Sequence, residues 1–266
     1  MRIAFIGGGV MAEAIISGII ESKIAMPKEI SVGEPIEARR TYLEDTYGLS
    51  AYSNNRTALD GASLTVLAVK PQSLSHVLPS LKGNVIENNV ILSIVAGVSM
   101  QTLTKGLNHQ AIIRVMPNTP AQIRAGMSVW TASPSVPEDK HLATRRILET
   151  LGEEHYTDDE GFIDMATALS ASGPAYVLLF IESLIDAGVY LGMPRNVARE
   201  LTLQTILGTT QLVKETGRHP ADLKDMVTSP GGTTIEALRA FENGGFRATV
   251  FNAVKAAHQK SQVLGG

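Results

Sequence analysis

The chain has 266 residues, of which 44% are hydrophobic and 18% are charged, and its formal net charge is −3. This composition is typical of a globular protein with a sizeable core, because disorder requires low hydrophobicity together with high net charge. The small negative charge and an aromatic content of 5% argue against a nucleic-acid partner, and the lack of cysteine excludes disulfides, cysteine-bound zinc and a thiolate nucleophile.

The N-terminal residues MRIAFIGGG have the pattern of a strand followed by a glycine turn and lack the three regions of a signal peptide. The longest uninterrupted apolar stretch near the middle of the chain, residues 175–181, is far shorter than the roughly 20 residues of a membrane span. We therefore expect a cytoplasmic protein that has no contact with a membrane.

In the first half of the chain, short apolar runs alternate with segments of helical periodicity. The apolar runs are residues 2–6, 30–32, 64–69, 90–95, 112–116 and 127–130, and helical spacing covers 11–20 and 36–47. Runs that are apolar on both faces are typical of strands covered by helices on both sides. This half of the chain therefore predicts an α/β domain with a parallel sheet.

The second half of the chain is helical almost throughout. From Asp159 onward the pattern predicts five or six helices, separated by glycine and proline, and no strand. The acidic residues 158–160 form the boundary between the half with alternating strands and helices and the helical half. We predict two domains, residues 1–157 (α/β) and 158–266 (all-α).

One helix of the second domain, residues 174–191, is apolar around most of its circumference. Only Glu182, Ser183 and Asp186 interrupt the apolar surface with polar side chains. Such a helix must be buried on nearly all sides. It is either the centre of a compact bundle or part of the interface with a second subunit, and periodicity alone leaves both open.

A glycine-rich turn follows the first strand directly and begins the first helix. Gly7, Gly9 and Ala12 occupy the three small positions of the pattern G-x-G-x-x-G/A. In that pattern the turn brings the backbone close to a pyrophosphate, which the amides at the helix start bind. Three glycines can also form a simple turn, but the strand before and the helix after favour a dinucleotide site.

The second predicted strand is followed by Glu34, roughly 20 residues beyond the glycine pattern, where a carboxylate binds the ribose hydroxyls of NADH. Arg39 and Arg40 follow closely and offer charges for the additional phosphate of NADPH. Both coenzymes therefore remain open, with a slight preference for NADH.

Three further strands end in residues suited to a ligand site, since ligands of open α/β sheets bind beyond the carboxyl ends of the strands. These ends are Lys70-Pro71-Gln72, Ala96-Gly97 and residues 117–120 (PNTP). The six histidines are scattered without metal-binding spacing, and the motifs of serine hydrolases, P-loop proteins and kinases are absent from the sequence. The pattern favours a redox enzyme whose coenzyme carries the chemistry.

In the second domain, residues 222–238 predict a helix end, a glycine-rich loop and a helix start. The amides and hydroxyls at that helix start could bind a carboxylate. Alternatively, the segment is a simple connection in which Thr233 or Thr234 caps the helix.

Together these segments resemble the Δ1-pyrroline-5-carboxylate reductase family over the full length of the chain. The motifs that carry the resemblance, in order, are FIGGGVMAEAI, LAVKPQ, RVMPNTPA, LSASGPAYV, LGMPR and residues 223–245 with their SPGGTT loop. The glycine turn occurs in many dehydrogenases, whereas the SPGGTT loop and MPNTPA together are specific to this family.

The resemblance implies an α/β Rossmann-type N-terminal domain followed by an all-α C-terminal dimerisation domain. It implies a homodimer, which can assemble further into a ring of dimers, and places the apolar helix at the subunit interface. The implied reaction is the reduction of the cyclic imine Δ1-pyrroline-5-carboxylate to L-proline, the last step of proline biosynthesis, with NADPH or NADH and no metal.

The resemblance also assigns residues. For coenzyme binding it gives Gly7, Gly8, Gly9, Val10, Met11, Glu34, Asn55, Ala68, Val69, Lys70, Pro71, Ala96 and Gly97. For the substrate it gives Glu160, Met226, Gly232, Thr233 and Thr234, with Thr234 as the catalytic hydroxyl that hydrogen-bonds the imine nitrogen. Val10 stands where members of the family often have a polar residue, and Glu34 stands where NADPH users commonly have small polar or basic residues.

Two other functions fit parts of the sequence. A β-hydroxyacid dehydrogenase or an imine reductase of broader scope would share the architecture, but the hydroxyacid enzymes carry a catalytic lysine on the long interdomain helix, and residues 174–191 contain none. A sensor that binds the dinucleotide without turnover would leave the polar SPGGTT loop unexplained.

Overall fold

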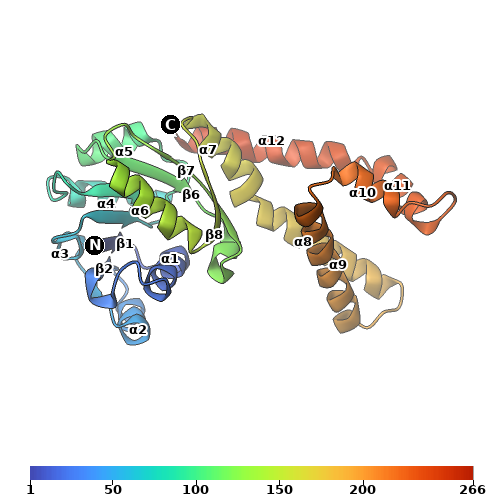
Figure 1. Cartoon of the computed structure of the whole chain (residues 1–266), viewed down its shortest axis with the longest axis horizontal. Coiled ribbons are helices and arrows are strands. Elements are labelled where there is room, and N and C mark those ends of the chain that lie inside the picture. Colours follow the sequence, from blue (N-terminus) through green and yellow to red (C-terminus); the bar gives the residue numbers. More distant parts are fainter. Residues whose placement is uncertain (266) are drawn as a thin grey trace. The chain divides into compact units, whose positions relative to one another are not determined.

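The computed structural model describes residues 1–265, which form two compact units (Figure 1). The first unit contains Met1–Ser172 and the end of the chain from Ala257, and the second contains Gly173–Ala256. The domain boundary expected between residues 157 and 158 stays a prediction, and Gly266, the last residue of the expected helical domain, lies outside the described residues.

The first unit is built on an eight-stranded sheet with the order β3-β2-β1-β4-β5-β6-β7-β8. The strands are β1 (Ile3–Ile6), β2 (Ile30–Gly33), β3 (Ser50–Tyr52), β4 (Leu64–Leu67), β5 (Val90–Ser93), β6 (Ile112–Met116), β7 (Gly126–Ala132) and β8 (Gly152–Tyr156). The first six run parallel to one another, and β7 is antiparallel to β6. The Rossmann-type α/β fold is thereby confirmed.

Helices cover both faces of the sheet, as the apolar strands predicted. On one face the core contains side chains of α1 (Val10–Glu21), α2 (Glu37–Tyr47) and α6 (Glu138–Glu149). On the other it contains side chains of α3 (Asn55–Leu59), α4 (Leu74–Leu81) and α5 (Met100–Leu107). Short 3-10 turns lie at Pro27–Glu29, Pro71–Ser73 and Thr119–Ile123. Successive residues of β1 enter opposite cores, which fixes the register of the strand.

Two strands, β3 and β8, and the reversed direction of β7 were not predicted. Strand β3 has three residues with exposed first and last side chains, and β8 (sequence GEEHY) alternates between intermediate and exposed positions. Neither contains the apolar run by which the other strands were recognised. Direction was missed because an antiparallel neighbour leaves no mark on the hydrophobicity of β7.

The second unit is entirely helical in the described residues, as predicted. It comprises α8 (Gly173–Tyr190), α9 (Arg195–Thr216), α10 (Pro220–Met226), α11 (Thr233–Asn243) and the first half of α12 (Phe246–Gly265). Before it, α7 (Gly161–Ala166) continues through a π-helical turn, Thr167–Ala171, into α8. Phe180, Phe241 and Phe246 join α8, α11 and α12 through ring contacts of 5.4–6.4 Å between centroids.

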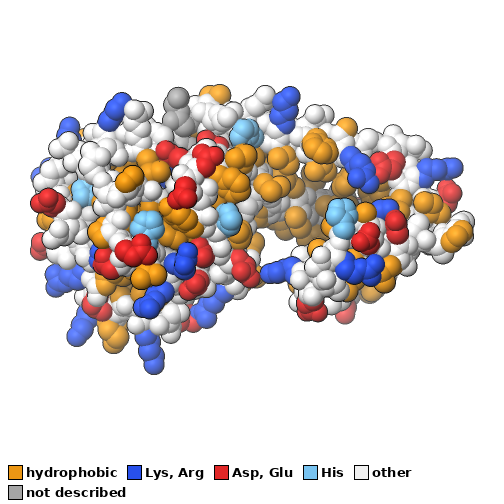
Figure 2. All heavy atoms as spheres, turned by 45° about the horizontal axis from the view of Figure 1, so that its top comes forward, with side chains coloured by type: hydrophobic (Ala, Val, Ile, Leu, Met, Phe, Trp, Pro, Cys, Tyr) orange, Lys and Arg blue, Asp and Glu red, His pale blue; other side chains and the backbone are white. Residues whose placement is uncertain are grey.

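Helix α8 is not the centre of a bundle within the single chain, because none of its residues is buried. Leu178 and Leu179 are 63% and 65% exposed, and Figure 2 shows apolar side chains on the surface of the helical unit. An apolar groove of about 720 Å³ runs between α8, α9 and α12. By length and composition the helical run Gly161–Tyr190 could also cross a membrane. This differs from the expectation from the sequence, in which no uninterrupted apolar stretch is long enough for a membrane span. A contiguous exposed apolar surface of this kind is typical of an interaction site.

Candidate active site

The glycine turn lies where the strand order reverses, between β1 and its neighbours β2 and β4. Gly7 has a φ of +97°, and a Cβ there would lie 2.6 Å from the carbonyl oxygen of Ala68, which follows β4. The Gly7 amide donates to the carbonyl of Gly33 at 2.8 Å. Only glycine allows the three strand ends to approach this closely. Ligands of doubly wound sheets bind at this reversal point.

Gly9 has a different reason to be glycine. It is the N-cap of α1, its backbone is extended (φ −68°, ψ −179°), and a Cβ built on it would meet nothing within 4 Å. No side chain of the described residues caps α1, so amides of its first turn have no intrahelical partner. Open space in front of free amides at a helix start fits a pyrophosphate.

A cleft of about 600 Å³ opens in front of this turn and brings together nine of the thirteen residues predicted for the coenzyme. They are Gly7, Gly8, Gly9, Val10, Glu34, Asn55, Ala68, Val69 and Lys70. The other four do not line the cleft: Met11 packs partly into the core below α1, Pro71 begins a 3-10 turn, and Ala96 and Gly97 follow β5.

Six residues of the cleft were not named from the sequence: Gly33, Pro35, Ile36, Ser53, Ser73 and Val77. Gly33 is informative, because a Cβ there would lie 2.4 Å from the Oδ1 atom of Asn55. The glycine lets Asn55 lie against the end of β2. The pattern Gly-Glu-Pro at the end of a predicted strand was the available signal.

Glu34 is 8% exposed and accepts two backbone hydrogen bonds. Its Oε2 atom accepts from the Gly8 amide at 2.9 Å, and its Oε1 atom accepts from the Ile36 amide at 3.0 Å. The alternative of a solvated acid at a helix start is therefore wrong. The carboxylate joins the end of β2 to the glycine turn.

Arg39, at the rim of the same cleft, belongs to a polar network with Glu13. Its Nε atom donates to the Gly8 carbonyl at 2.5 Å and its Nη2 atom to Glu13 at 2.5 Å, while Tyr42 and Tyr47 donate to the same carboxylate. Burial raises the pKa of Glu13, but these hydrogen bonds outweigh it and leave the pKa below its usual value. Burial and the bond to Glu13 raise the pKa of Tyr47 to about 12.

The turn after β5 is covered by the end of the chain. A Cβ on Gly97 would lie 2.6 Å from the Cβ of Leu264, and Ser261 donates to Asp164 at 2.8 Å. Helix α12 therefore ends as part of the first unit, packed against the predicted nicotinamide side.

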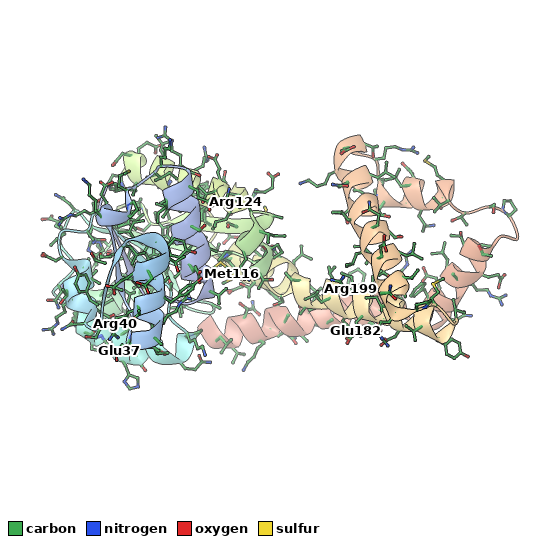
Figure 3. The ribbon with its side chains drawn as sticks, turned by 90° about the horizontal axis from the view of Figure 1, so that it is seen from below. Glu37, Arg40, Met116, Arg124, Glu182 and Arg199 are labelled. Atoms are coloured by element: carbon green, nitrogen blue, oxygen red, sulfur yellow. The ribbon has the colours of Figure 1, made fainter. Side chains whose placement is uncertain are left out.

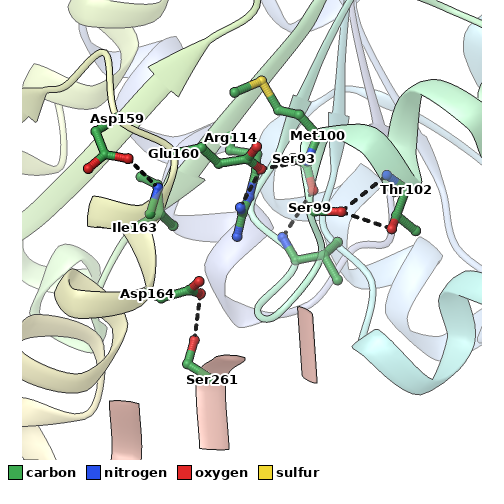
Figure 4. Close-up of polar contacts among 12 residues, drawn as sticks. Ser93, Ser99, Met100, Thr102, Arg114, Asp159, Glu160, Ile163, Asp164 and Ser261 are labelled. Carbon is green, nitrogen blue, oxygen red and sulfur yellow. Dashed lines mark hydrogen bonds and ion pairs between the residues drawn. The ribbon is translucent and has the colours of Figure 1, made fainter. Parts of the chain in front are cut away.

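Glu160, predicted to contact the substrate, is engaged within the first unit (Figure 4). Its Oε1 atom accepts from the Arg114 guanidinium at 2.5 Å and from the amide of Met100, the first residue of α5, at 2.6 Å. The Arg114 side chain is 5% exposed, so Glu160 compensates a buried charge. The loop with the other predicted substrate residues lies in the second unit.

In that loop, Gly231 has a φ of +67° and Gly232 is the N-cap of α11. Thr233 and Thr234 are the first two residues of the helix, so the alternative in which a threonine caps it is wrong. The N-cap has no side-chain hydrogen bond, Thr234 is half-buried and Met226 is 67% exposed. Amides and a hydroxyl at one helix start can bind a carboxylate and a neighbouring polar atom.

Two family models match the two parts of the chain. The model described as NADP oxidoreductase, coenzyme F420-dependent, matches residues 2–97, and the model described as pyrroline-5-carboxylate reductase dimerisation matches residues 160–264. The first covers the glycine turn and the cleft, and the second covers the exposed helices and the SPGGTT loop.

Relatives match over the whole length. The chain is 47% identical to pyrroline-5-carboxylate reductase of Synechocystis, covering 100% of this chain and 98% of the relative, and 39% identical to that of Escherichia coli, covering 99% and 98%. Among solved structures, the Plasmodium falciparum pyrroline carboxylate reductase with NADP bound superposes with a TM-score of 0.91 at 33% identity, covering 100% of this chain and 98% of that one. The two family models and the sequence identities over the full length lead to the same conclusion. The chain belongs to the pyrroline-5-carboxylate reductase family.

Proposed function

We propose that the chain reduces Δ1-pyrroline-5-carboxylate to L-proline with NADH or NADPH, as the last step of proline biosynthesis. The observation that supports this most directly is the identity of 47% to a pyrroline-5-carboxylate reductase along the whole chain. The same chain has both the cleft at the glycine turn and a helix start in the SPGGTT loop that no side chain caps. A dinucleotide sensor would need the cleft but not the loop.

The coenzyme lies in the cleft of the first unit. Gly7, Gly8, Gly9 and Val10 hold the pyrophosphate: Gly7 and Gly8 shape the turn, because their amides already donate to Gly33 and Glu34, and the amides of Gly9 and Val10 at the start of α1 face the pyrophosphate. The close packing of Gly7 and the open space at Gly9 support this. The adenosine part lies at Glu34 and Asn55, and the nicotinamide lies toward Ala68, Val69 and Lys70. Met11 and Pro71 adjoin these positions along the chain, Ala96 and Gly97 follow the neighbouring strand β5, and the four complete the proposed site. When bound, a reduced nicotinamide supplies the hydride for the reaction.

The substrate binds at the start of α11. The amides of Thr233 and Thr234, which follow the N-cap Gly232, bind its carboxylate, since the Gly232 amide donates to the Ser229 carbonyl. The Thr234 hydroxyl donates a hydrogen bond to the imine nitrogen. The imine carbon gains a hydride and the nitrogen gains a proton from solvent, because a threonine hydroxyl is a poor acid. Thr234 therefore orients and polarises the imine. Met226 borders the loop. Glu160 contacts the substrate, as the resemblance implies, and also holds Arg114 and the start of α5 through its carboxylate.

The assembly is a homodimer in the cytoplasm, in which a second copy covers α8 and the groove between α8, α9 and α12. The match of residues 160–264 to a dimerisation model supports this cover rather than a membrane, as do the charged side chains Glu182 and Asp186 within α8. A ring of such dimers is part of the proposal.

The test is the oxidation of NADH and of NADPH, followed by absorbance, with Δ1-pyrroline-5-carboxylate present and absent. We expect oxidation that depends on the imine and L-proline as the product by mass spectrometry. If folded protein binds a coenzyme yet oxidises neither one in the presence of the imine, the reductase function is wrong and a sensor is favoured.

A further inference from the structure

The carboxylate of Glu34 has a fixed position at the adenosine end of the coenzyme cleft. It accepts the Gly8 amide with one oxygen and the Ile36 amide with the other, at 2.9 and 3.0 Å. Each carboxylate oxygen can accept a second hydrogen bond. Glu34 can therefore hold the glycine turn and still accept hydrogen bonds from the two hydroxyls of a ribose.

The backbone that carries Glu34 is held from both sides, so the side chain cannot move aside with its loop. The Glu34 amide donates to the Tyr52 carbonyl at 2.9 Å. From α2, the Nη1 atom of Arg40 donates to the carbonyls of Glu34 and Pro35 at 2.9 and 2.8 Å. Figure 3 shows Arg40 with Glu37 at the start of this helix.

The arginine that could attract a phosphate at this place is engaged elsewhere. Arg39 donates to the Gly8 carbonyl and to Glu13, and its guanidinium lies 5.0 Å from the centre of the Tyr42 ring. Turning the Nε and Nη2 atoms toward a phosphate would break both hydrogen bonds. Arg40 directs its Nη1 atom to the two carbonyls of the loop.

We propose that residues 34–40 make this chain selective for NADH, with Glu34 as the residue that rejects the 2′-phosphate of NADPH. A 2′-phosphate would bring a second negative charge against a carboxylate that is 8% exposed and cannot withdraw. The inference rests on the coenzyme site of the proposed function and deepens it. NADP occupies the related Plasmodium structure, so the selectivity is a property of these residues of this chain and not of the family.

The test is equilibrium binding of NADH and of NADPH by isothermal titration calorimetry, without substrate. The unchanged protein should bind NADH more tightly by roughly 10- to 100-fold, the range expected for placing two like charges together. Glu34→Gln keeps the shape of the side chain, removes its charge and loses one of the two backbone hydrogen bonds, because its NH2 group cannot accept an amide. That loss weakens both coenzymes alike, so the test is the ratio of the two dissociation constants, which should move at least about tenfold toward NADPH. Glu37→Gln is the matched control: it removes the same charge three residues away at an exposed position and should leave the ratio unchanged.

Each outcome of the titrations supports or overturns the NADH selectivity that is assigned to Glu34. A ratio that favours NADPH in the unchanged protein overturns the inference, while imine-dependent oxidation of NADPH would leave the proposed function intact. Equal weakening of both coenzymes in Glu34→Gln also overturns it, because Glu34 would then only hold the glycine turn. Tighter binding of NADH without any imine reduction would support the inference and refute the proposed function.

Discussion

Gly7 and Gly9 show how two glycines of one motif serve different purposes. An alanine at Gly7 would place its Cβ 2.6 Å from the Ala68 carbonyl oxygen at a φ of +97°, whereas at Gly9 it would meet no protein atom within 4 Å. We expect Gly7→Ala to lower the free energy of unfolding by roughly 1–3 kcal/mol. Gly9→Ala should leave stability nearly unchanged but weaken coenzyme binding about tenfold or more, since the methyl group projects into the cleft. Urea denaturation and calorimetric titration of both variants separate the two roles. A Gly9→Ala protein with unaltered affinity would contradict the placement of the pyrophosphate.

Thr234 is the residue on which the proposed chemistry depends most directly. Thr234→Ala removes one hydrogen bond to the imine and should reduce kcat/KM by the equivalent of about 1–3 kcal/mol. Thr46→Ala, which removes a hydroxyl from an exposed position of α2, serves as the control. Steady-state kinetics with saturating coenzyme measure both. Unchanged turnover in Thr234→Ala would remove this residue from the site.

Glu13 makes the stability of the first unit sensitive to acid. Its pKa is lowered in the folded state from a reference value of 4.5, because hydrogen bonds from Arg39, Tyr42 and Tyr47 outweigh burial. A lowered folded pKa contributes stability that is present above the unfolded pKa and is lost as the pH falls through the folded pKa. We expect the unfolding free energy to decline below a pH of about 4.5, and to decline less steeply in Glu13→Gln. Denaturation curves at a series of acidic pH values give both slopes, and equal slopes would show that the network adds nothing.

At the scale of elements, the ion pair between Arg114 and Glu160 ties α7 to β6 and to the start of α5. Glu160→Ala leaves a guanidinium with a 5% exposed side chain without its carboxylate, so the unfolding free energy should fall by about 3 kcal/mol. The double variant Arg114→Met with Glu160→Leu should be more stable than Glu160→Ala, because the buried charge is gone as well. If Glu160→Ala abolished turnover while stability stayed the same, Glu160 would act on the substrate and not through α5.

At the scale of the whole molecule, α8 exposes an apolar surface that a second copy is proposed to cover. Leu179 is 65% exposed and lines the groove of about 720 Å³, so Leu179→Glu would bury a charge in the interface and should yield a monomer. Ile123→Glu, at a 78% exposed position of the first unit, should leave the dimer intact. Light scattering coupled to size-exclusion chromatography gives the masses, including that of a ring of dimers. A Leu179→Glu protein that remains dimeric would place the interface elsewhere.

Much of the candidate site followed from the sequence because its residues are adjacent along the chain. The turn from Gly7 to Val10 and the run from Ala68 to Lys70 line the cleft as expected, since each directly follows a strand whose apolar run is recognisable. Gly33 was not predicted, because the contact that requires glycine there is with Asn55, more than twenty residues away in the sequence. Met11 was placed by motif alone, and Pro71, Ala96 and Gly97 by motif and by their position after a strand. The direction of a side chain and the cover that Leu264 provides for Gly97 depend on contacts that no local pattern records.

The sequence by itself determined the fold class, the division into an α/β half and a helical half, six of the eight strands and the family. Strands buried on both faces appear as apolar runs, and tight turns require glycine at fixed positions, so both can be recognised within a short segment. Only the tertiary structure decided what Glu34, Glu160 and α8 contact. The sequence left Glu34 between a solvated acid and a ribose ligand, and the structure joins it to two backbone amides. It left α8 between a bundle centre and an interface, and the structure exposes it within the single chain. A residue's partners are set by packing between segments distant in sequence, and periodicity within one segment carries no information about them.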